Sequence, residues 1–242
     1  MDYKNIRYAQ QGNVGLLTIN RPAQTNKLNI QTMNEMVLAL KKAEDNGDCR
    51  VVVLTGEGEY FCNGGELGDF RHQSSMEIRK FGESFIDLHL TITGLSKPVI
   101  AAVQGHALGG GFHLVEACDL AVASEEAEFG VPEITSGLAP MMALTGVSRT
   151  LGRKEAMELA FFGQTISARK AQEIGLVNWV CPRGEVLARA NGIAQSLAGF
   201  NATALNLCKK LYQRIGAAQY RREMEQGLDM LITLLKSGEA GQ

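Results

Sequence analysis

The sequence is poor in the features that mark several classes of protein. Its five cysteines, Cys49, Cys62, Cys118, Cys181 and Cys208, are odd in number and scattered, and no two form a C-x-x-C pair. This spacing argues against both a disulfide framework and a cysteine-ligated zinc site. No apolar run reaches membrane-spanning length, and the N-terminus has no apolar segment of the signal-peptide kind. We therefore expect a cytoplasmic protein with no membrane partner.

The chain also lacks an excess of charge of either sign. Its 242 residues carry a formal net charge of −2, with 21% charged and 45% hydrophobic residues. A nearly neutral chain has no general electrostatic attraction for a polyanion, so we expect no nucleic-acid partner. The hydrophobic fraction is ordinary for a globular protein, and the length is enough to bury one large core or two smaller ones.

Strand and helix patterns alternate along the first three quarters of the chain. Short apolar runs predict buried strands, and apolar residues at three- and four-residue spacing predict helices. The expected strands are 14–20, 50–55, 98–103, 120–124 and 175–180, and the expected helices in this part are 30–45, 76–95, 154–162 and 168–174. From about Arg183 the pattern becomes wholly helical, with helices expected at 185–198, 203–215 and 220–235. This order predicts an α/β fold, with a core domain over 1–182 and a C-terminal helical region over 183–242.

Two glycine turns stand out as candidates for chemistry. Gly109-Gly110-Gly111 comes after the apolar run 98–103 and leads into a helix-compatible segment, and Gly64-Gly65 comes after the run 50–55. Glycine lets backbone N–H groups approach a ligand closely, and a helix N-terminus favours negative charge. Either turn alone is most simply a tight strand-to-helix connection. If the two lie side by side, however, their N–H groups could converge on one oxygen as an oxyanion hole, with Glu133 some twenty positions further on.

A rival interpretation is a nicotinamide-dependent oxidoreductase. Gly105, Gly109 and Gly111 have a spacing that resembles the phosphate turn of short-chain dehydrogenases, and Glu125 and Glu126 follow at about the distance of a ribose-binding acid. The turn is in mid-chain, however, and none of the five tyrosines is followed four residues later by lysine. The Tyr-x-x-x-Lys pair of those enzymes is therefore missing, and we set this interpretation aside.

Five motifs in order resemble the crotonase (enoyl-CoA hydratase/isomerase) superfamily. They are Phe61-Cys62-Asn63-Gly64-Gly65-Glu66-Leu67, the run from Ala101 to Gly111, Ala117-Cys118-Asp119-Leu120, Phe129-Gly130-Val131-Pro132-Glu133-Ile134, and the run from Ile166 to Val177. The resemblance covers about Val14 to Val180, and the helical end of the chain is compatible with it. It implies a spiral of ββα turns, a C-terminal region used for trimerisation, and homotrimers or dimers of trimers. The implied substrate is an acyl-CoA thioester, with no separate cofactor and no metal.

The resemblance also implies roles for particular residues. The N–H groups of Gly65 and Gly110 would bind the thioester oxygen, and Glu133 would be the acid/base. Asn26, Lys27, Leu28 and Asn63 would lie along the CoA groove. The full set that we expect to bind substrate is Lys27, Leu28, Asn63, Gly64, Leu67, Gly109, Pro132, Leu138 and Met141. Removing the weakly acidic α-proton of a thioester needs both a base and a stabilised enolate oxygen. Apolar neighbours such as Val131, Ile134, Leu138 and Met141 would raise the pKa of Glu133.

One departure from the family pattern leaves the reaction open. Hydratases of the family carry a second glutamate two residues after the triple glycine, where this chain has His113. A single carboxylate suffices for isomerisation, whereas a carboxylate with a neutral imidazole could still serve hydration. His113 could equally be a structural residue of the pocket wall that is hydrogen-bonded to Glu116. We expect an enoyl-CoA isomerase or hydratase. A decarboxylase, a thioester hydrolase, a dehydratase or a non-catalytic acyl-CoA-binding protein remain alternatives.

Overall fold

The computed structural model describes residues 2–68, 72–214 and 217–237, and its elements alternate as the sequence predicts. The larger of two sheets contains six strands in the order β1-β2-β3-β5-β7-β10. Their bounds are β1 Ile6–Gln11, β2 Val14–Ile19, β3 Val51–Gly56, β5 Val99–Val103, β7 Leu120–Ser124 and β10 Trp179–Cys181. Only β1 runs antiparallel to its neighbour. Every residue of β3 and β5 is buried, as the continuous apolar runs of a doubly covered parallel sheet require.

A smaller sheet of four strands lies beside the first. It consists of β4 Tyr60–Asn63, β6 His106–Leu108, β8 Glu128–Gly130 and β9 Ile166–Ser167, in that order. The first three strands are parallel, and β9 closes the sheet in the antiparallel direction. Each of the three parallel strands directly follows a strand of the large sheet in the chain, so strands are added alternately to the two sheets.

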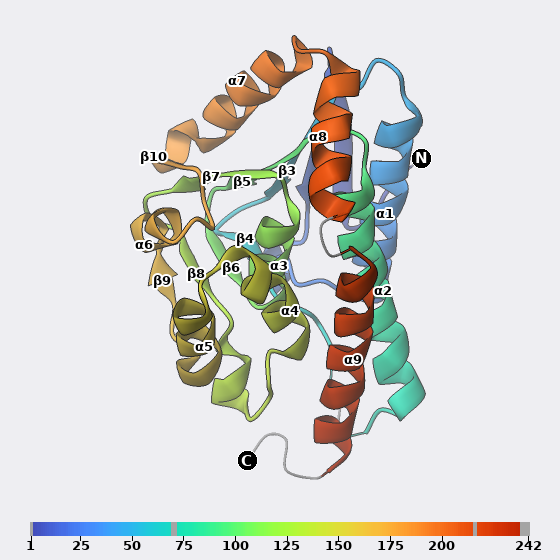
Figure 1. The fold of residues 1–242 in the computed structure, drawn as a ribbon, viewed down its shortest axis with the longest axis vertical. Coiled ribbons are helices and arrows are strands. Elements are labelled where there is room, and N and C mark those ends of the chain that lie inside the picture. Colours follow the sequence, from blue (N-terminus) through green and yellow to red (C-terminus); the bar gives the residue numbers. More distant parts are fainter. Residues whose placement is uncertain (1, 69–71, 215–216, 238–242) are drawn as a thin grey trace.

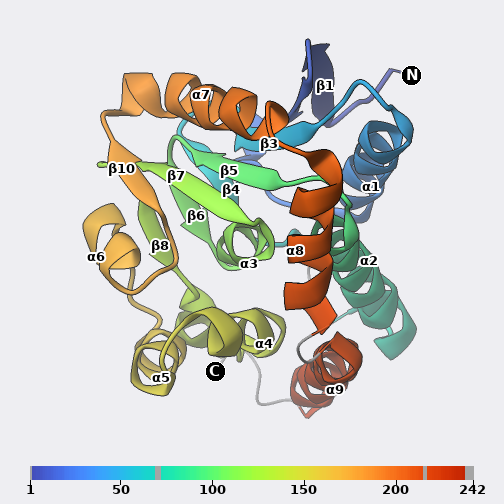
Figure 2. The ribbon, with the colours of Figure 1, turned by 45° about the horizontal axis from the view of Figure 1, so that its top comes forward.

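Helices cover both faces of the large sheet (Figure 2). On one face α7, Val186–Ala198, packs Val186, Ala190 and Ala194 against apolar side chains of β3, β5 and β7. The other face is covered by α1 Ile30–Asp45, α2 Ser75–Gly94 and α3 Gly110–Ala117. The N-termini of α1 and α2 are fixed by their caps. Asn29 accepts the N–H of Thr32, and Ser74 forms a reciprocal capping box with Glu77.

The remaining helices are α4 Met141–Thr150, α5 Arg153–Phe162, α6 Ala168–Glu173, α8 Ala202–Arg214 and α9 Ala217–Lys236, with 3₁₀ turns at Pro22–Gln24, Pro132–Ser136 and Arg183–Glu185. Of these helices, α4, α5 and α9 lie in the lower half of the molecule in Figure 1, and α8 lies in the upper half near α7. Helix α9 runs beside α2 and packs on both α2 and α4 (Figures 1 and 2). No helix in the described part of the chain combines the length and the apolar character that a bilayer crossing requires.

The predicted α/β class is confirmed, and most predicted helices agree with the observed bounds within two or three residues. One expectation was wrong in detail, because the strand predicted at 175–180 begins only at Trp179. Strand β1 and the small sheet were not predicted. After the first glycine turn, Gly65 forms a parallel bridge with Leu28, and α2 begins ten residues later, as the predicted helix 76–95 requires. The division at residue 183 stays a prediction, although α7 packs on the sheet of the first region.

Candidate active site

The candidate site lies where three neighbouring strands of the small sheet end. In the register of this sheet Asn63 is paired with Leu108, and Leu108 with Gly130. Because parallel strands have their carboxyl ends at one edge of a sheet, the segments that follow them meet there. These segments contain Gly64-Gly65, Gly109-Gly110 and Glu133, so the topology of the small sheet brings together the three predicted groups.

Close approach of the two glycine turns depends on their backbone conformation. Gly64 has φ 84° and Gly109 has φ 53°, both in the left-handed region that side chains disfavour. A Cβ at Gly64 would lie 3.6 Å from the amide nitrogen of Gly110, and a Cβ at Gly109 would lie 3.5 Å from the Cα of Gly64. The first turn is fixed from the other side, since Leu28 N–H donates to the Gly64 carbonyl and Glu66 N–H donates to the Leu28 carbonyl.

The N–H groups of Gly65 and Gly110 are available to a ligand. Neither donates in any of the hydrogen bonds between described residues, and Gly110 is the first residue of α3, where a helix has no internal acceptor for it. Both glycines line one cavity. Two backbone donors at one cavity, one of them at a helix N-terminus, can bind an oxygen that becomes negatively charged. Their use as an oxyanion hole stays a prediction.

The cavity has a volume of about 150 Å³. Its lining is mostly apolar, and Glu133 is the one ionisable side chain among the described residues that form it. The lining residues are Gly65, Leu67, Ile78, Phe81, Gly82, Phe85, Gly110, Glu133, Leu138, Ala139, Pro140, Met141, Met142, Ala143, Leu228 and Leu231. The predicted Leu67, Leu138 and Met141 are among them. Apolar walls around a few polar groups are typical of small-molecule sites.

Glu133 is placed by the 3₁₀ turn Pro132–Ser136, with Pro132 at its first position. A Cβ at Gly109 would lie 2.9 Å from Oε1 of Glu133, so the carboxyl group approaches the second glycine turn closely. Its Oε2 is buried and has no hydrogen-bond partner. Burial raises the pKa of Glu133 from 4.5 to about 7. Ile134, which we expected to be one of its apolar neighbours, is 40% exposed and lies against Gly163 instead.

His113 lies behind the cavity and is not part of its described lining. It is fully buried, and the ring of Phe85, which does line the cavity, stacks on it at 5.3 Å between centroids. Burial lowers the pKa of His113 to about 3, so the imidazole is neutral. The expected hydrogen bond to Glu116 is not formed. Nδ1 of His113 and Oε2 of Glu116 are 3.5 Å apart, and neither atom has a hydrogen-bond partner. The catalytic role predicted for His113 stays a prediction.

His89, His113 and Glu116 form the one group of possible metal ligands found among the described residues. Their potential donor atoms all lie within 4.8 Å of one another. The two imidazole rings are stacked, however, with centroids 4.2 Å apart and planes inclined by 22°. A ring nitrogen binds a metal in the plane of its ring, so the lone pairs of stacked rings run side by side and do not converge on one ion. Moreover, Nε2 of His89 is in a 2.6 Å hydrogen bond with the Tyr220 hydroxyl.

The residues predicted along the CoA groove have local structural roles. Leu28 is fully buried and forms the bridge to Gly65. The buried amide group of Asn26 donates to the carbonyls of Glu57 and Tyr60 and so fixes the turn before Leu28. Asn63 donates to the hydroxyl of Thr25, and Lys27 is half-buried in the same turn. These contacts hold the Gly64-Gly65 turn in place, and direct binding of CoA by Lys27 or Asn63 stays a prediction.

Sequence reasoning missed the helical walls of the cavity. Ile78, Phe81 and Phe85 lie on one face of α2, and Leu228 and Leu231 come from α9, at the far end of the chain. Apolar residues at helical spacing indicate a buried face, but they do not distinguish a cavity wall from the core. No signal in the sequence therefore identified them as site residues.

Comparison with known proteins gives the family of the chain. Residues 9–240 match the family model of enoyl-CoA hydratase/isomerase. A short-chain-enoyl-CoA hydratase of Clostridium acetobutylicum is 37% identical over 216 residues, which are 88% of this chain and 83% of that protein. A 2,3-dehydroadipyl-CoA hydratase of Escherichia coli is 33% identical over 96% of this chain and 90% of its own.

The fold is found among solved structures as well. The crystal structure of an enoyl-CoA hydratase/isomerase from Xanthobacter autotrophicus Py2 has a TM-score of 0.91 at 27% identity, with 99% of this chain and 90% of the other covered. The predicted crotonase-type fold is thereby confirmed. On the family model and the extent of these similarities, the chain belongs to the enoyl-CoA hydratase/isomerase family of enzymes.

Proposed function

We propose that the chain isomerises enoyl-CoA thioesters by moving the double bond from C3–C4 to C2–C3 through an enolate. The observation that carries this proposal is a single buried carboxyl group, Glu133, at a cavity that Gly65 and Gly110 also line, and the N–H groups of these two glycines donate to none of the described residues. Acyl-CoA is the substrate on the strength of the family, and the reaction needs no cofactor or metal beyond the thioester itself.

The reaction follows from these groups. The Glu133 carboxylate removes a proton from C2 of a 3-enoyl thioester, and the electron pair moves onto the thioester oxygen. The N–H groups of Gly65 and Gly110 donate to this oxygen as its negative charge develops. When the enolate collapses, the double bond forms between C2 and C3, and the protonated Glu133 returns its proton to C4. A carboxyl group with a pKa near 7 can both take and return the proton at neutral pH.

Isomerisation is favoured over hydration because hydration needs a second polar group to hold and activate water. The position at which we expected that group, His113, is behind Phe85 and outside the described cavity lining. Hydration remains the second candidate, since the curated relatives reported above are named as hydratases. Decarboxylation and thioester hydrolysis have no observation of their own in this site.

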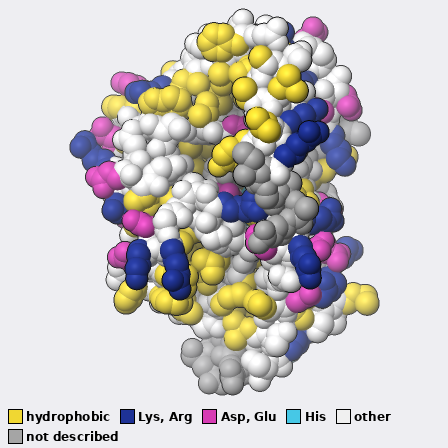
Figure 3. All heavy atoms as spheres, viewed as in Figure 1, with side chains coloured by type: hydrophobic (Ala, Val, Ile, Leu, Met, Phe, Trp, Pro, Cys, Tyr) yellow, Lys and Arg dark blue, Asp and Glu magenta, His cyan; other side chains and the backbone are white. Residues whose placement is uncertain are grey.

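A trimer or a dimer of trimers is part of the proposal. In the view of Figure 3, hydrophobic side chains gather at the top of the molecule, over α7 and α8. None of the residues of α8 is buried, and Leu207, Leu211 and Tyr212 are more than 60% exposed. An amphipathic helix with an uncovered apolar face supports association of the C-terminal region with further copies. Sedimentation analysis of the purified chain tests this part.

Two substrates separate the candidate reactions. With a 3-enoyl-CoA the conjugated thioester forms and its absorbance rises, whereas hydration of crotonyl-CoA removes the conjugation and lowers it. We expect the first reaction to be much faster than the second. Glu133→Gln should lower kcat/KM for isomerisation by about 10²–10⁴-fold, the usual contribution of a general acid/base. Equal activity of this variant and the wild type would refute the mechanism.

Variants of His113 test its place in the reaction. We expect His113→Leu to keep isomerase activity close to that of the wild type, because the imidazole does not reach the cavity. His113→Glu should not create a hydratase, because the new carboxyl group would lie beside the buried Glu116. A large loss of isomerisation in the first variant, in folded protein, would show that His113 is catalytic. Hydration by the second would favour the two-carboxylate chemistry of hydratases.

A further inference from the structure

The far wall of the active-site cavity is formed by α9, which belongs to the C-terminal helical region. Leu228 and Leu231 of this helix line the cavity together with Phe81 and Phe85 of α2. The site is therefore completed by a segment more than ninety residues beyond Glu133 in the chain. The position of α9 decides how far an acyl group can extend from the two glycine turns.

Leu228 packs into a space on α2 that exists because residue 82 is a glycine and has no side chain. A Cβ at Gly82 of α2 would lie 2.2 Å from Cδ1 and 2.7 Å from Cδ2 of Leu228, so the leucine occupies the notch at Gly82, the space that a Cβ there would fill. Leu228 is only 1% exposed. On the other side, a Cβ at the neighbouring Gly227 would lie 2.9 Å from the carbonyl oxygen of Met141 in α4. The Gly227-Leu228 pair is thus held between α2 and α4.

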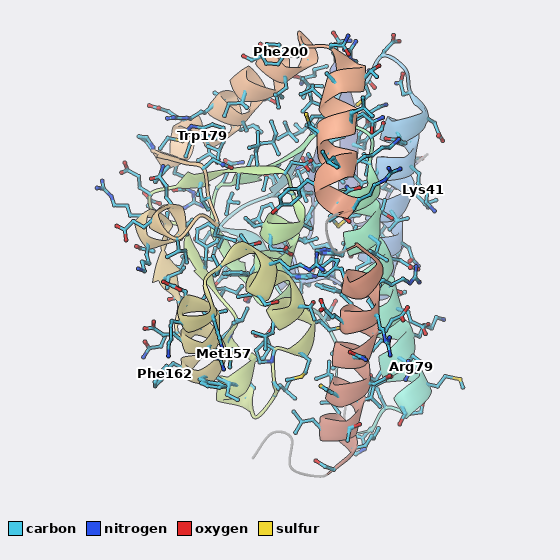
Figure 4. The ribbon with its side chains drawn as sticks, in the orientation of Figure 1. Lys41, Arg79, Met157, Phe162, Trp179 and Phe200 are labelled. Carbon is cyan, nitrogen blue, oxygen red and sulfur yellow. The ribbon has the colours of Figure 1, made fainter. Side chains whose placement is uncertain are left out.

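A polar contact fixes the same part of α9 from outside. Arg79 of α2 lies beside α9 (Figure 4), and its guanidinium group donates to Asp229, the residue after Leu228, at 2.5 Å. Both side chains are about half exposed, so this pair contributes little to stability by itself. The Arg79–Asp229 pair does, however, connect α2 and α9 at the same place as the packing of Leu228. The wall of the cavity is consequently a fixed surface rather than a free helix end.

The size of the cavity limits the acyl group. The volume of the cavity is about 150 Å³. Sites for drug-sized ligands have about 300–1,000 Å³, so the cavity can take a short acyl chain while the CoA part stays outside. The described lining contains no lysine, arginine or histidine. A terminal carboxylate on the acyl group would be desolvated there without a partner, which is costly.

We propose that Leu228, seated in the notch at Gly82, sets the acyl-chain length of the substrate, and that the substrate is a short, apolar acyl thioester of about four to six carbons. The inference rests on the proposed function insofar as the thioester is placed at Gly65 and Gly110. Leu231 extends the same wall. Chains of eight carbons or more, and dicarboxylic chains such as an adipyl group, are excluded.

Binding of saturated acyl-CoAs tests the wall without any turnover. We expect calorimetry with wild-type protein to give at least about tenfold tighter binding of butyryl- and hexanoyl-CoA than of decanoyl- or adipyl-CoA, since one methylene in an apolar site changes discrimination by about tenfold or more. Leu228→Ala should reduce the difference between hexanoyl- and decanoyl-CoA to a few-fold. The matched control is Met224→Ala, which removes a fully buried α9 side chain outside the cavity lining and should keep the wild-type preference.

The outcomes separate this inference from the proposed reaction. If the length preference exists and Leu228→Ala removes it, the inference holds even if no isomerisation is detected, in which case the proposed reaction alone is wrong. If Leu228→Ala leaves the preference unchanged, or if the wild type binds decanoyl-CoA as well as hexanoyl-CoA, the inference is wrong whatever the turnover. Should Leu228→Ala not fold, Leu231→Ala removes a less buried part of the same wall and is read in the same way.

Discussion

At the scale of one residue, the proposed chemistry depends on the burial of Glu133. Its carboxyl group lies in an apolar cavity, one of its oxygens has no hydrogen-bond partner, and its pKa rises from 4.5 to about 7. Burial disfavours the charged form, and no cation contributes to the shift. The group therefore changes its charge in the pH range in which the enzyme would have to move a proton.

The pH dependence of isomerisation should report this pKa. We expect kcat/KM for a 3-enoyl-CoA to rise with pH, to reach half of its maximum near the Glu133 pKa of about 7, and then to level off, because only the carboxylate can remove the C2 proton. Initial rates between pH 5.5 and 9 measure it. The exposed Glu158→Gln is the control and should leave the profile unchanged. A profile that is already level at pH 5.5, as the ordinary glutamate pKa of 4.5 would give, would contradict the role of burial.

At this scale the sequence predicted what is local and missed what is contributed from elsewhere. Gly65, Gly110 and Glu133 were identified because each belongs to a short motif that resembles the pattern of the crotonase superfamily. The surroundings of His113 could not be read in this way. Its burial depends on Phe85 and His89 of α2 and, through His89, on Tyr220 of α9. None of these contacts leaves a pattern in the residues around His113.

At the scale of elements, long helices were predictable and very short strands were not. Helices α1 and α2 have apolar faces and capping residues at Asn29 and Ser74. The strands of the small sheet have only two to four residues, which is too few to show the alternation of apolar and polar residues that predicts a strand. This matters for the site, because those strands place both glycine turns and Glu133. The prediction attributed the turns to the wrong pair of strands, in the large sheet.

The contact between α2 and α9 can be tested with two glycines of the same helix. Gly82→Ala should destabilise the protein by about 1–3 kcal/mol, because the added Cβ would overlap Leu228. Gly94→Ala is the matched control. Position 94 is the last residue of α2 and is exposed, and a Cβ there has no atom within 4 Å. It should be neutral or slightly stabilising.

Urea unfolding of both alanine variants, followed by circular dichroism, gives the comparison. Equal midpoints for Gly82→Ala and Gly94→Ala would show that α9 does not pack on α2 as described. The exposed Phe162 at the end of α5, which points outward in Figure 4, offers a further reference, since Phe162→Ala should change the midpoint little.

At the scale of the whole molecule, buried titratable groups determine how stability changes with pH. Burial raises the pKa of Glu116 and of Glu133 to about 7, and it lowers the pKa of His113 to about 3 and that of His89 well below 6.5. Between pH 4.5 and 7 the two carboxyl groups lose their protons in the unfolded chain but keep them in the folded protein. The contribution of these carboxyl groups to the free energy of unfolding therefore falls as pH rises. Below pH 6.5 the two histidines gain protons in the unfolded chain but not in the folded protein. The contribution of these histidines to the free energy of unfolding therefore falls as pH falls.

Replacing one buried carboxyl group should remove part of this dependence. The glutamine side chain of Glu116→Gln does not titrate. The free energy of unfolding of this variant, relative to that of the wild type, should therefore increase steadily from pH 4.5 to 7. The increase should be at most about 3 kcal/mol, because one pKa unit corresponds to about 1.4 kcal/mol. Free energies of unfolding at pH 5 and pH 7.5, from urea titrations, measure the change. A difference between variant and wild type that is the same at both pH values would mean that Glu116 titrates normally.

The Tyr220–His89 hydrogen bond and the seat of Leu228 belong to one helix, and this has a consequence for the evolution of the chain. A change in the position of α9 that makes room for a bulkier acyl group would also move Tyr220, which holds His89 against His113 of α3, the helix that begins at Gly110. Acyl-chain length and the placement of Gly110, the proposed oxyanion donor, would therefore change together. A descendant that accepts longer substrates would need compensating substitutions along α2 to keep its rate.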